Sequence, residues 1–190
     1  MLRRVEARGG LAMTMISPKA AIAAVLAALL GGCVDSAAPL LTGAQPVFGP
    51  DVKVHVYLLG ESHAAGPEIG VYHWDGHEYR ALNKPSFEIA AFTAIPLAGN
   101  DLIIQSRSTR PQIKGVEYGI ARKIAPSTYM VSAIDEEEAD AATRAKFCAT
   151  GGSDSCHVTT QEGLLALARA AAAKPELKGS LAILVGEDKP

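Results

Sequence analysis

His73, Asp75 and His77 come closest to a metal-binding motif, because imidazole and carboxylate groups recur there at every second position. On one straight strand the three side chains would share a face. Asp75-Gly76, however, is a dipeptide typical of a hairpin turn with a two-residue loop. Such a turn pairs Trp74 with His77 and points the two histidines to opposite faces. We therefore expect no metal site here.

The same hairpin would place three aromatic residues on one face, Tyr72, Trp74 and Tyr79. One interpretation is a platform on which a flat ligand stacks, as in sugar-binding proteins. The other is cross-strand packing, because aromatic pairs stabilise hairpins without any ligand. The sequence leaves both open and favours packing.

Two further groups have reactive or charged side chains. Residues 61–63 (Glu-Ser-His) bring a carboxylate, a hydroxyl and an imidazole together, but adjacent side chains rarely form the geometry of a catalytic triad. Arg107, Arg110 and Lys114 are expected on a solvated loop, with an anion site as the alternative. No phosphate-binding glycine loop, H-E-x-x-H or C-x-x-C motif is present, so we predict no catalytic residue and no cofactor.

The N-terminal region has the features of an export signal. Basic residues come first, at Arg3, Arg4, Arg8 and Lys19. An uncharged apolar run of 11 residues follows at 20–30, well short of the roughly 20 that a transmembrane helix needs. The run ends in Leu30-Gly31-Gly32-Cys33, which resembles the lipobox of bacterial lipoproteins.

This resemblance implies that residues 1–32 are a cleaved signal peptide and that Cys33 then carries a diacylglyceryl group and usually a third acyl chain, such as palmitate. Two or more acyl chains anchor a protein stably to a membrane. In similar lipoproteins an aspartate directly after the cysteine favours the inner membrane. Here Val34 holds that position and Asp35 follows, so the outer membrane of a Gram-negative envelope is expected. The same features are complete from Met13 or Met15 as well as from Met1.

Removing residues 1–32 leaves 14 basic and 19 acidic residues, a net charge of −5. Nucleic-acid binding requires a basic face, so this balance argues against it. Cys148 and Cys156 remain and are predicted to form a disulfide, because disulfides persist in exported proteins. In the chain-entropy model, closing so short a loop contributes about 2.5 kcal/mol.

The mature chain divides into two parts. Residues 33–50 contain three prolines and two glycines without a hydrophobic period, which predicts a flexible tether that holds the domain off the membrane. Residues 51–190 are expected to form a single α+β domain. Period-2 alternation and turn residues predict an antiparallel meander of about seven strands, at 51–58, 69–74, 77–82, 87–97, 102–106, 117–124 and 128–134.

Two helices and a short strand complete the predicted domain. Asp135 and Glu138 have the spacing of a helix start that continues to Phe147. Thr159 and Glu162 have the spacing of a capping box for the second helix, and Lys174-Pro175 is expected to end it. The apolar stripe of this helix is predicted at Leu164, Leu167, Ala168 and Ala171. The apolar run 181–185 is expected to return to the sheet as a buried strand.

Together these features predict a membrane-anchored envelope lipoprotein whose domain faces the periplasm or the cell surface. Its role is expected to be non-enzymatic, such as binding a partner protein, an envelope component or a small ligand. One alternative is an envelope hydrolase or metal enzyme that uses His55, His73 or His157 with nearby carboxylates. The other is an inhibitor that acts through the loop between Cys148 and Cys156.

Overall fold

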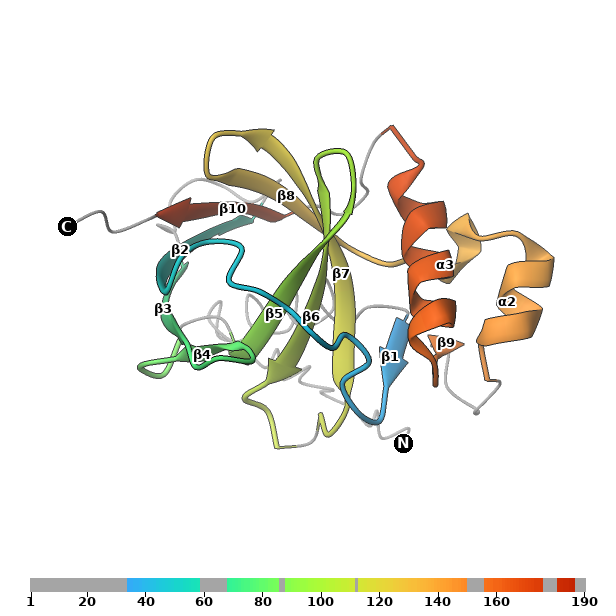
Figure 1. Ribbon diagram of the computed structural model, residues 1–190, viewed down its shortest axis with the longest axis horizontal. Helices are drawn as coiled ribbons and strands as arrows, with labels where there is room; N and C mark the ends of the chain where they lie inside the picture. Colours follow the sequence, from blue (N-terminus) through green and yellow to red (C-terminus); the bar gives the residue numbers. More distant parts are fainter. Residues whose placement is uncertain are drawn as a thin grey trace, which may run out of the picture.

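The computed structural model describes residues 34–58, 68–85, 88–111, 113–149, 156–175 and 181–186. They form one mostly antiparallel sheet that closes into a barrel, with helices packed on one side of it (Figure 1). None of the helices in these ranges is long and apolar enough to cross a bilayer.

Seven consecutive strands follow one another as a meander. They are β2 (Asp51–Leu58), β3 (Glu68–Trp74), β4 (Tyr79–Ala81), β5 (Ile89–Ala98), β6 (Asp101–Ser108), β7 (Val116–Ala125) and β8 (Thr128–Ala133). The last strand, β10 (Leu181–Gly186), lies antiparallel between β2 and β8 and so joins the two ends of the meander. The predicted α+β fold, with its meander, two later helices and C-terminal strand, is confirmed, and the closure of the meander by β10 is new.

The hairpin between β3 and β4 has a different register from the one predicted. Trp74 pairs with Tyr79, so the loop has four residues, 75–78, and the predicted Trp74–His77 pairing is wrong. The Asp75 side chain explains the wider turn, because its Oδ1 accepts hydrogen bonds from the backbone N–H groups of His77 and Glu78 at 2.9 and 3.0 Å. A shift by two residues keeps each side chain on its face, so Tyr72, Trp74 and Tyr79 still lie together.

Alternation along the strands builds the core inside the barrel. Val52, Val54 and Val56 of β2 are buried, while Lys53 and His55 between them are partly exposed. Rings from several strands meet these valines, and the buried members of this interior core are Phe48, Val52, Val54, Val56, Tyr72, Tyr79, Ala94, Leu102, Ala121, Tyr129 and Val131.

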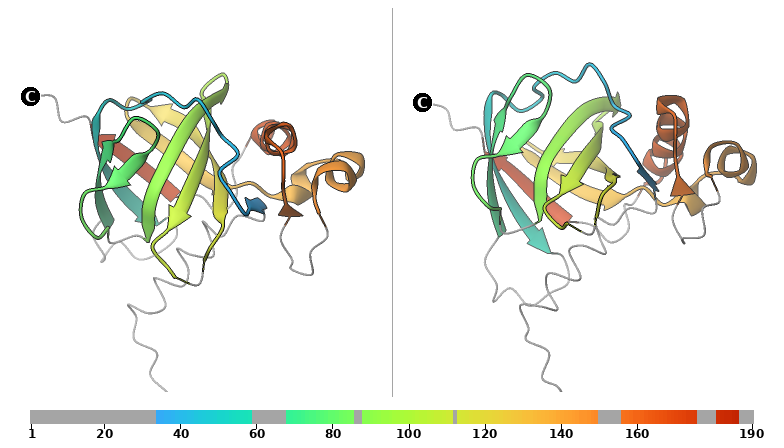
Figure 2. Two further views of the ribbon diagram at one scale, coloured as in Figure 1. Left: turned by 60° about the horizontal axis from the view of Figure 1, so that its bottom comes forward. Right: turned by 90° about the horizontal axis from the view of Figure 1, so that it is seen from below.

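A second core, which we call the outer core, covers the outside of β6 and β7. It packs Ile103 and Ile120 of the barrel wall against the apolar face of helix α3 (Gln161–Ala172). End-on views show this helix and α2 (Ala141–Phe147) on one side of the barrel (Figure 2). The short strand β1 (Val34–Ser36) pairs with the N-terminal end of β7, and β9 (Cys156–His157) pairs with β1, so both extend the sheet outside the closed barrel.

Helix starts differ in detail from their predictions. Asp135 caps only a short 3-10 helix, η1 (Glu136–Glu138), and Asp140 caps α2 separately through the Thr143 backbone N–H. The N-cap of α3 is Thr160 and not Thr159, since the Thr160 hydroxyl accepts from the Gly163 N–H at 3.2 Å. The helix itself ends at Ala172, close to the predicted stop at Lys174-Pro175.

Residues 34–50 do not form the flexible tether that their composition suggested. Val34 of β1 is completely buried in the outer core, and Leu41 is 4 % exposed. Phe48 reaches the interior core, where it meets the rings of Tyr79 and Tyr129 at centroid distances of 5.9 and 5.6 Å. A segment without periodicity can be packed when single apolar residues fill separate sites on a surface that other elements have already formed.

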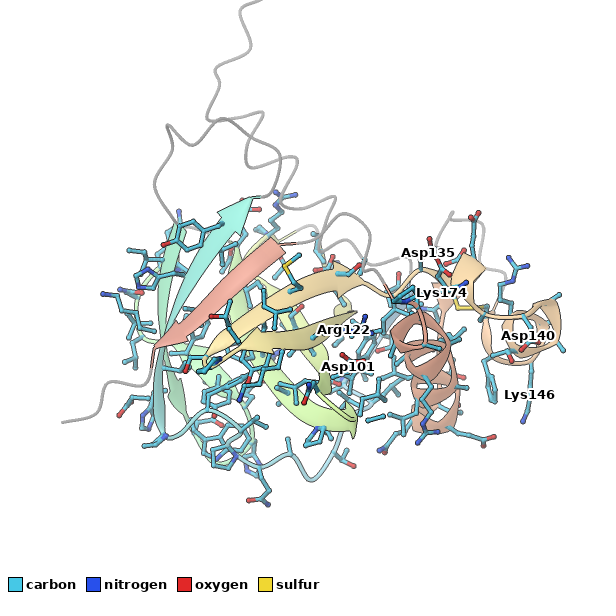
Figure 3. All side chains as sticks on the ribbon, turned by 90° about the horizontal axis from the view of Figure 1, so that it is seen from above. Asp101, Arg122, Asp135, Asp140, Lys146 and Lys174 are labelled. Atoms are coloured by element: carbon cyan, nitrogen blue, oxygen red, sulfur yellow. A yellow bond between two sulfur atoms is a disulfide. The ribbon has the colours of Figure 1, made fainter. Side chains whose placement is uncertain are left out.

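Arg122 of β7 joins the barrel to the end of α3 (Figure 3). Its Nε and Nη2 donate to the two carboxylate oxygens of Asp101 at 2.8 and 3.0 Å. Its Nη1 and Nη2 also donate to the carbonyls of Ala172, Lys174 and Pro175. One side chain thus satisfies carbonyl groups that the helix end leaves without an intrahelical partner.

Candidate functional site

The barrel interior offers little room for a ligand. Its cavity measures about 60 Å³ and is lined mainly by apolar and aromatic residues, among them Phe48, Phe92 and Tyr129. Sites for drug-sized ligands have roughly 300–1,000 Å³. The interior of this barrel is therefore a packed core with a small cavity.

The predicted aromatic face belongs to this core. Tyr72 and Tyr79 are completely buried, and only Trp74 is partly exposed. Phe92 stacks on Tyr79 at 4.9 Å and meets Tyr72 edge-on at 5.0 Å. A ligand has no access to the two tyrosine rings, so the packing interpretation describes them and the platform interpretation does not.

The two buried tyrosines hold neighbouring backbone through their hydroxyl groups. The Tyr79 hydroxyl accepts from the Phe48 N–H and donates to the Gly49 carbonyl, both at 2.9 Å. The Tyr72 hydroxyl donates to the Ile89 carbonyl at 3.0 Å, and burial raises the pKa of Tyr72 above its usual value. Both side chains therefore have structural roles at the barrel wall.

Two larger clefts lie on the outside of the barrel, and Arg107 of β6 lines both. The first, which we call the strap cleft, has about 520 Å³ and lies between residues 39–45, the β3–β4 loop and the outer face of β5 and β6. The second, which we call the cationic cleft, has about 400 Å³ and includes Arg80, Arg107 and Lys114 in its lining. Both volumes fall within the range of small-molecule sites.

Gln105 fixes the wall of the strap cleft. Its Oε1 accepts hydrogen bonds from the backbone N–H groups of Leu40 and Leu41, both at 2.9 Å. Its Nε2 donates to the Thr93 hydroxyl at 3.2 Å. The buried amide therefore ties residues 40–41 to the barrel. The role of Gln105 could not be predicted from the sequence, because a single glutamine in a strand gives no sign of a partner more than 60 positions away.

The β3–β4 loop places the Glu78 carboxylate beside Arg107, the residue that lines both clefts. The backbone N–H groups of Glu78 and His77 hold the pKa of the Asp75 carboxyl down at about 2, so Asp75 stays charged and keeps the loop folded. Glu78 then forms ion pairs with both Arg80, at 2.8 Å, and Arg107. Of the predicted loop cations, Arg110 pairs with Glu88, and Lys114 is exposed.

A third group of titratable side chains lies on β7, β1 and β9. Strand register places Glu117, Asp35 and His157 side by side in one row. His157 Nδ1 lies 2.5 Å from Asp35 Oδ1. Burial, together with the nearby Asp35 charge, raises the pKa of Glu117 to about 7, although Arg110 opposes this shift. The row therefore holds a carboxyl group that exchanges its proton near neutral pH.

The histidines proposed for an enzyme do not come together. His157 lies in this row, His55 lies on β2, and His73 of β3 pairs with Asp51 at 2.7 Å. In the described ranges, no three His, Cys, Asp or Glu side chains are placed to hold a metal ion. Residues 61–63 lie outside the described residues.

Cys148 and Cys156 lie at disulfide distance, with their Cα atoms 4.8 Å apart. The pair links the end of α2 to the start of β9. Residues 150–155 between them, which the inhibitor interpretation requires, lie outside the described residues, and so does Cys33.

In comparisons with known proteins, no protein-family model, no curated protein and no solved structure matches the chain.

Proposed function

We propose that this chain is a lipid-anchored binding protein of the bacterial cell envelope, attached through Cys33 and binding its ligand on the outside of the barrel. The observation that carries the proposal is the position of β1, which begins at Val34, directly after the cysteine of the lipobox-like sequence.

This position also changes how the domain would meet the membrane. Val34 is completely buried and its strand pairs with β7 and β9. An acylated Cys33 would therefore be joined to a folded edge without a spacer. We infer that the barrel lies against the membrane surface instead of standing away from it. Because Val34, and not an aspartate, follows Cys33, the outer membrane is the membrane that we propose.

Cavity sizes support binding on the outside of the barrel. The interior cavity of about 60 Å³ holds no more than a few atoms, whereas the two outer clefts have about 520 and 400 Å³. Polar groups that fix an orientation, such as Glu78 and Arg107, also lie at the outer clefts. A non-enzymatic role is the simplest one for clefts that contain ion pairs and amides without an activated nucleophile.

An envelope hydrolase is the second candidate function, and the row of Glu117, Asp35 and His157 favours it. Glu117 has a pKa of about 7, which suits a group that transfers protons near neutral pH. Hydrolysis that disappears in Glu117→Gln, while the fold and the anchor are retained, would favour this candidate over binding.

The anchor is tested by intact mass of the full-length chain expressed in a Gram-negative host. We expect a mature form that begins at Cys33 and carries acyl groups, and its recovery with outer membranes after fractionation. Cys33→Ala should lose the acyl mass. Replacing Cys148 and Cys156 by serine is the matched control and should keep it. An unprocessed, unmodified mass for the unmutated chain would contradict the proposal.

A further inference from the structure

The cationic cleft is built on one row of the barrel wall. Arg80 of β4 pairs with Ala91 of β5, and Ala91 pairs with Arg107 of β6. The three side chains therefore share a face, with the two arginine backbones about 10 Å apart. The short side chain of Ala91 lies between them, and all three residues line the cleft.

The β6–β7 connection adds a third cation to the lining of the cleft. Lys114 and Gly115, from the β6–β7 connection, complete the lining. No aspartate or glutamate is among the described residues that line this cleft. The mature chain has a net charge of −5, so the three cations do not belong to a generally basic surface.

Nearby carboxylates compensate this charge only in part. Arg80 and Arg107 share the single carboxylate of Glu78, and Arg80 also reaches Asp75 at 2.5 Å. Lys114 forms no ion pair with any described carboxylate. The Arg107 Nε is buried, and no acceptor for its N–H is present in the described part of the chain. The positive charges of Arg80, Arg107 and Lys114 are thus balanced by only two of the described carboxylates, Asp75 and Glu78.

We propose that the cationic cleft binds a phosphate group. Guanidinium groups match phosphate oxygens through paired N–H donors, and a lysine adds a mobile point charge. A cleft of about 400 Å³ accepts a phosphate with a small organic group attached. Aromatic rings for base stacking are absent from its described lining, so a simple phosphate ester fits better than a nucleotide.

The cleft also lies near the proposed anchor. A Cβ atom built on Gly115 would be 3.0 Å from the Ser36 carbonyl oxygen, so these two backbones touch. Ser36 is three residues from Cys33, or about 10 Å along an extended chain. The phosphate can therefore come from a lipid headgroup or from a soluble ester. The headgroup source rests on the proposed anchoring, whereas the phosphate site itself does not.

The first experiment tests the site without the anchor. The full-length Cys33→Ala chain is titrated with inorganic phosphate in chloride buffer, and binding is measured by calorimetry. Lys114→Glu should weaken phosphate binding at least about tenfold, because a charge-assisted contact is replaced by repulsion. Lys123→Glu, an equal change of charge at another exposed lysine, is the matched control and should change it less than about twofold. Thermal unfolding of both variants verifies that they fold.

A second arm identifies the source of the phosphate. The same chains are sedimented with vesicles of equal parts phosphatidylglycerol and phosphatidylcholine. Binding to vesicles and to inorganic phosphate, both lost in Lys114→Glu, supports a headgroup. Binding to inorganic phosphate alone supports a soluble ester. If Lys114→Glu and Lys123→Glu bind inorganic phosphate equally well and bind vesicles equally well, the proposed site is overturned. This outcome is independent of the intact mass of the unmutated chain, which tests the anchor.

Discussion

The barrel interior and the outer core are both well buried, but different interactions hold them. Inside, rings of Phe48, Tyr72, Tyr79 and Phe92 contact one another, and tyrosine hydroxyls bond to the barrel's own backbone. Outside, aliphatic side chains of β6 and β7 meet α3, whose C-terminal end binds Arg122, and the Cys148–Cys156 pair joins the neighbouring α2 to β9. Both cores thus combine packing with hydrogen bonds, and the outer region adds an ion-paired arginine and a cysteine pair that connect its helices to the sheet.

This difference implies that the two regions respond differently to single changes. Truncation of an interior ring should weaken the whole barrel, because all seven meander strands, β2 to β8, contribute side chains to that core. Loss of an outer link should first release the helices, which open as a smaller cooperative unit. The four predictions below test this contrast, beginning with the largest effect.

Phe48→Ala should destabilise the protein by about 4 kcal/mol, the usual cost of removing a buried phenyl ring. The ring contacts Tyr79, Phe92 and Tyr129, so its loss leaves a cavity beside the existing one. Denaturant unfolding measures the change. Ile124→Ala, at an exposed position, is the control and should cost less than about 0.5 kcal/mol. A cost below about 1 kcal/mol for Phe48→Ala would show that residues 34–50 do not support the interior core.

Arg122→Ala should cost about 3 kcal/mol, since it leaves the partly buried Asp101 carboxylate and three helix-end carbonyls without their donor. Arg122→Lys should recover only part of this loss, because lysine cannot make the same set of contacts. In Arg122→Ala, hydrogen exchange should accelerate more in α3 than in β2–β5. Equal acceleration in both regions would contradict the contrast between the two cores.

Replacing Cys148 and Cys156 together by serine should cost about 2.5 kcal/mol from the lost loop closure. We expect the effect in α2 and β9, the two elements that the pair connects. Unfolding with and without a reductant gives the same comparison for the unmutated chain. The serine variant should not respond to the reductant and serves as the control. An unmutated chain whose stability is the same with and without the reductant would argue against the bond.

Stability should fall as the pH rises from about 4.5 to about 7, because burial raises the pKa of Glu117 to about 7. In this range the folded state keeps a proton that the unfolded state has released, so rising pH favours unfolding. After discounting for partial exposure, the contribution is about 1 kcal/mol. Glu117→Gln should flatten this part of the profile, while Glu162→Gln, at an exposed helix position, should not. An unchanged slope in Glu117→Gln would place its pKa near the ordinary value.

Local patterns were sufficient to predict most elements. Alternation at 51–58 and turn residues at 99–100 and 126–127 mark strands and hairpins that the structure contains. The spacing of Leu164, Leu167, Ala168 and Ala171 likewise predicts the buried face of α3. These features depend on residues a few positions apart, which is the distance that periodicity can measure.

The candidate sites were less predictable for the opposite reason. Arg107 was identified only as part of a charged loop, yet its neighbours Glu78 and Arg80 come from another hairpin. Asp35, Glu117 and His157 are distant in sequence and meet only because β1 pairs with both β7 and β9.

By itself, the sequence determined the order of the meander strands, of the two later helices and of the C-terminal strand, together with the lipobox-like sequence at Cys33, because each is encoded by neighbouring residues. Only the tertiary structure decided that β10 closes the meander and that residues 34–50 pack on the barrel. It also decided which charged groups share a cleft. These outcomes depend on pairing between distant segments, whose loop-closure cost is offset only when the whole barrel forms.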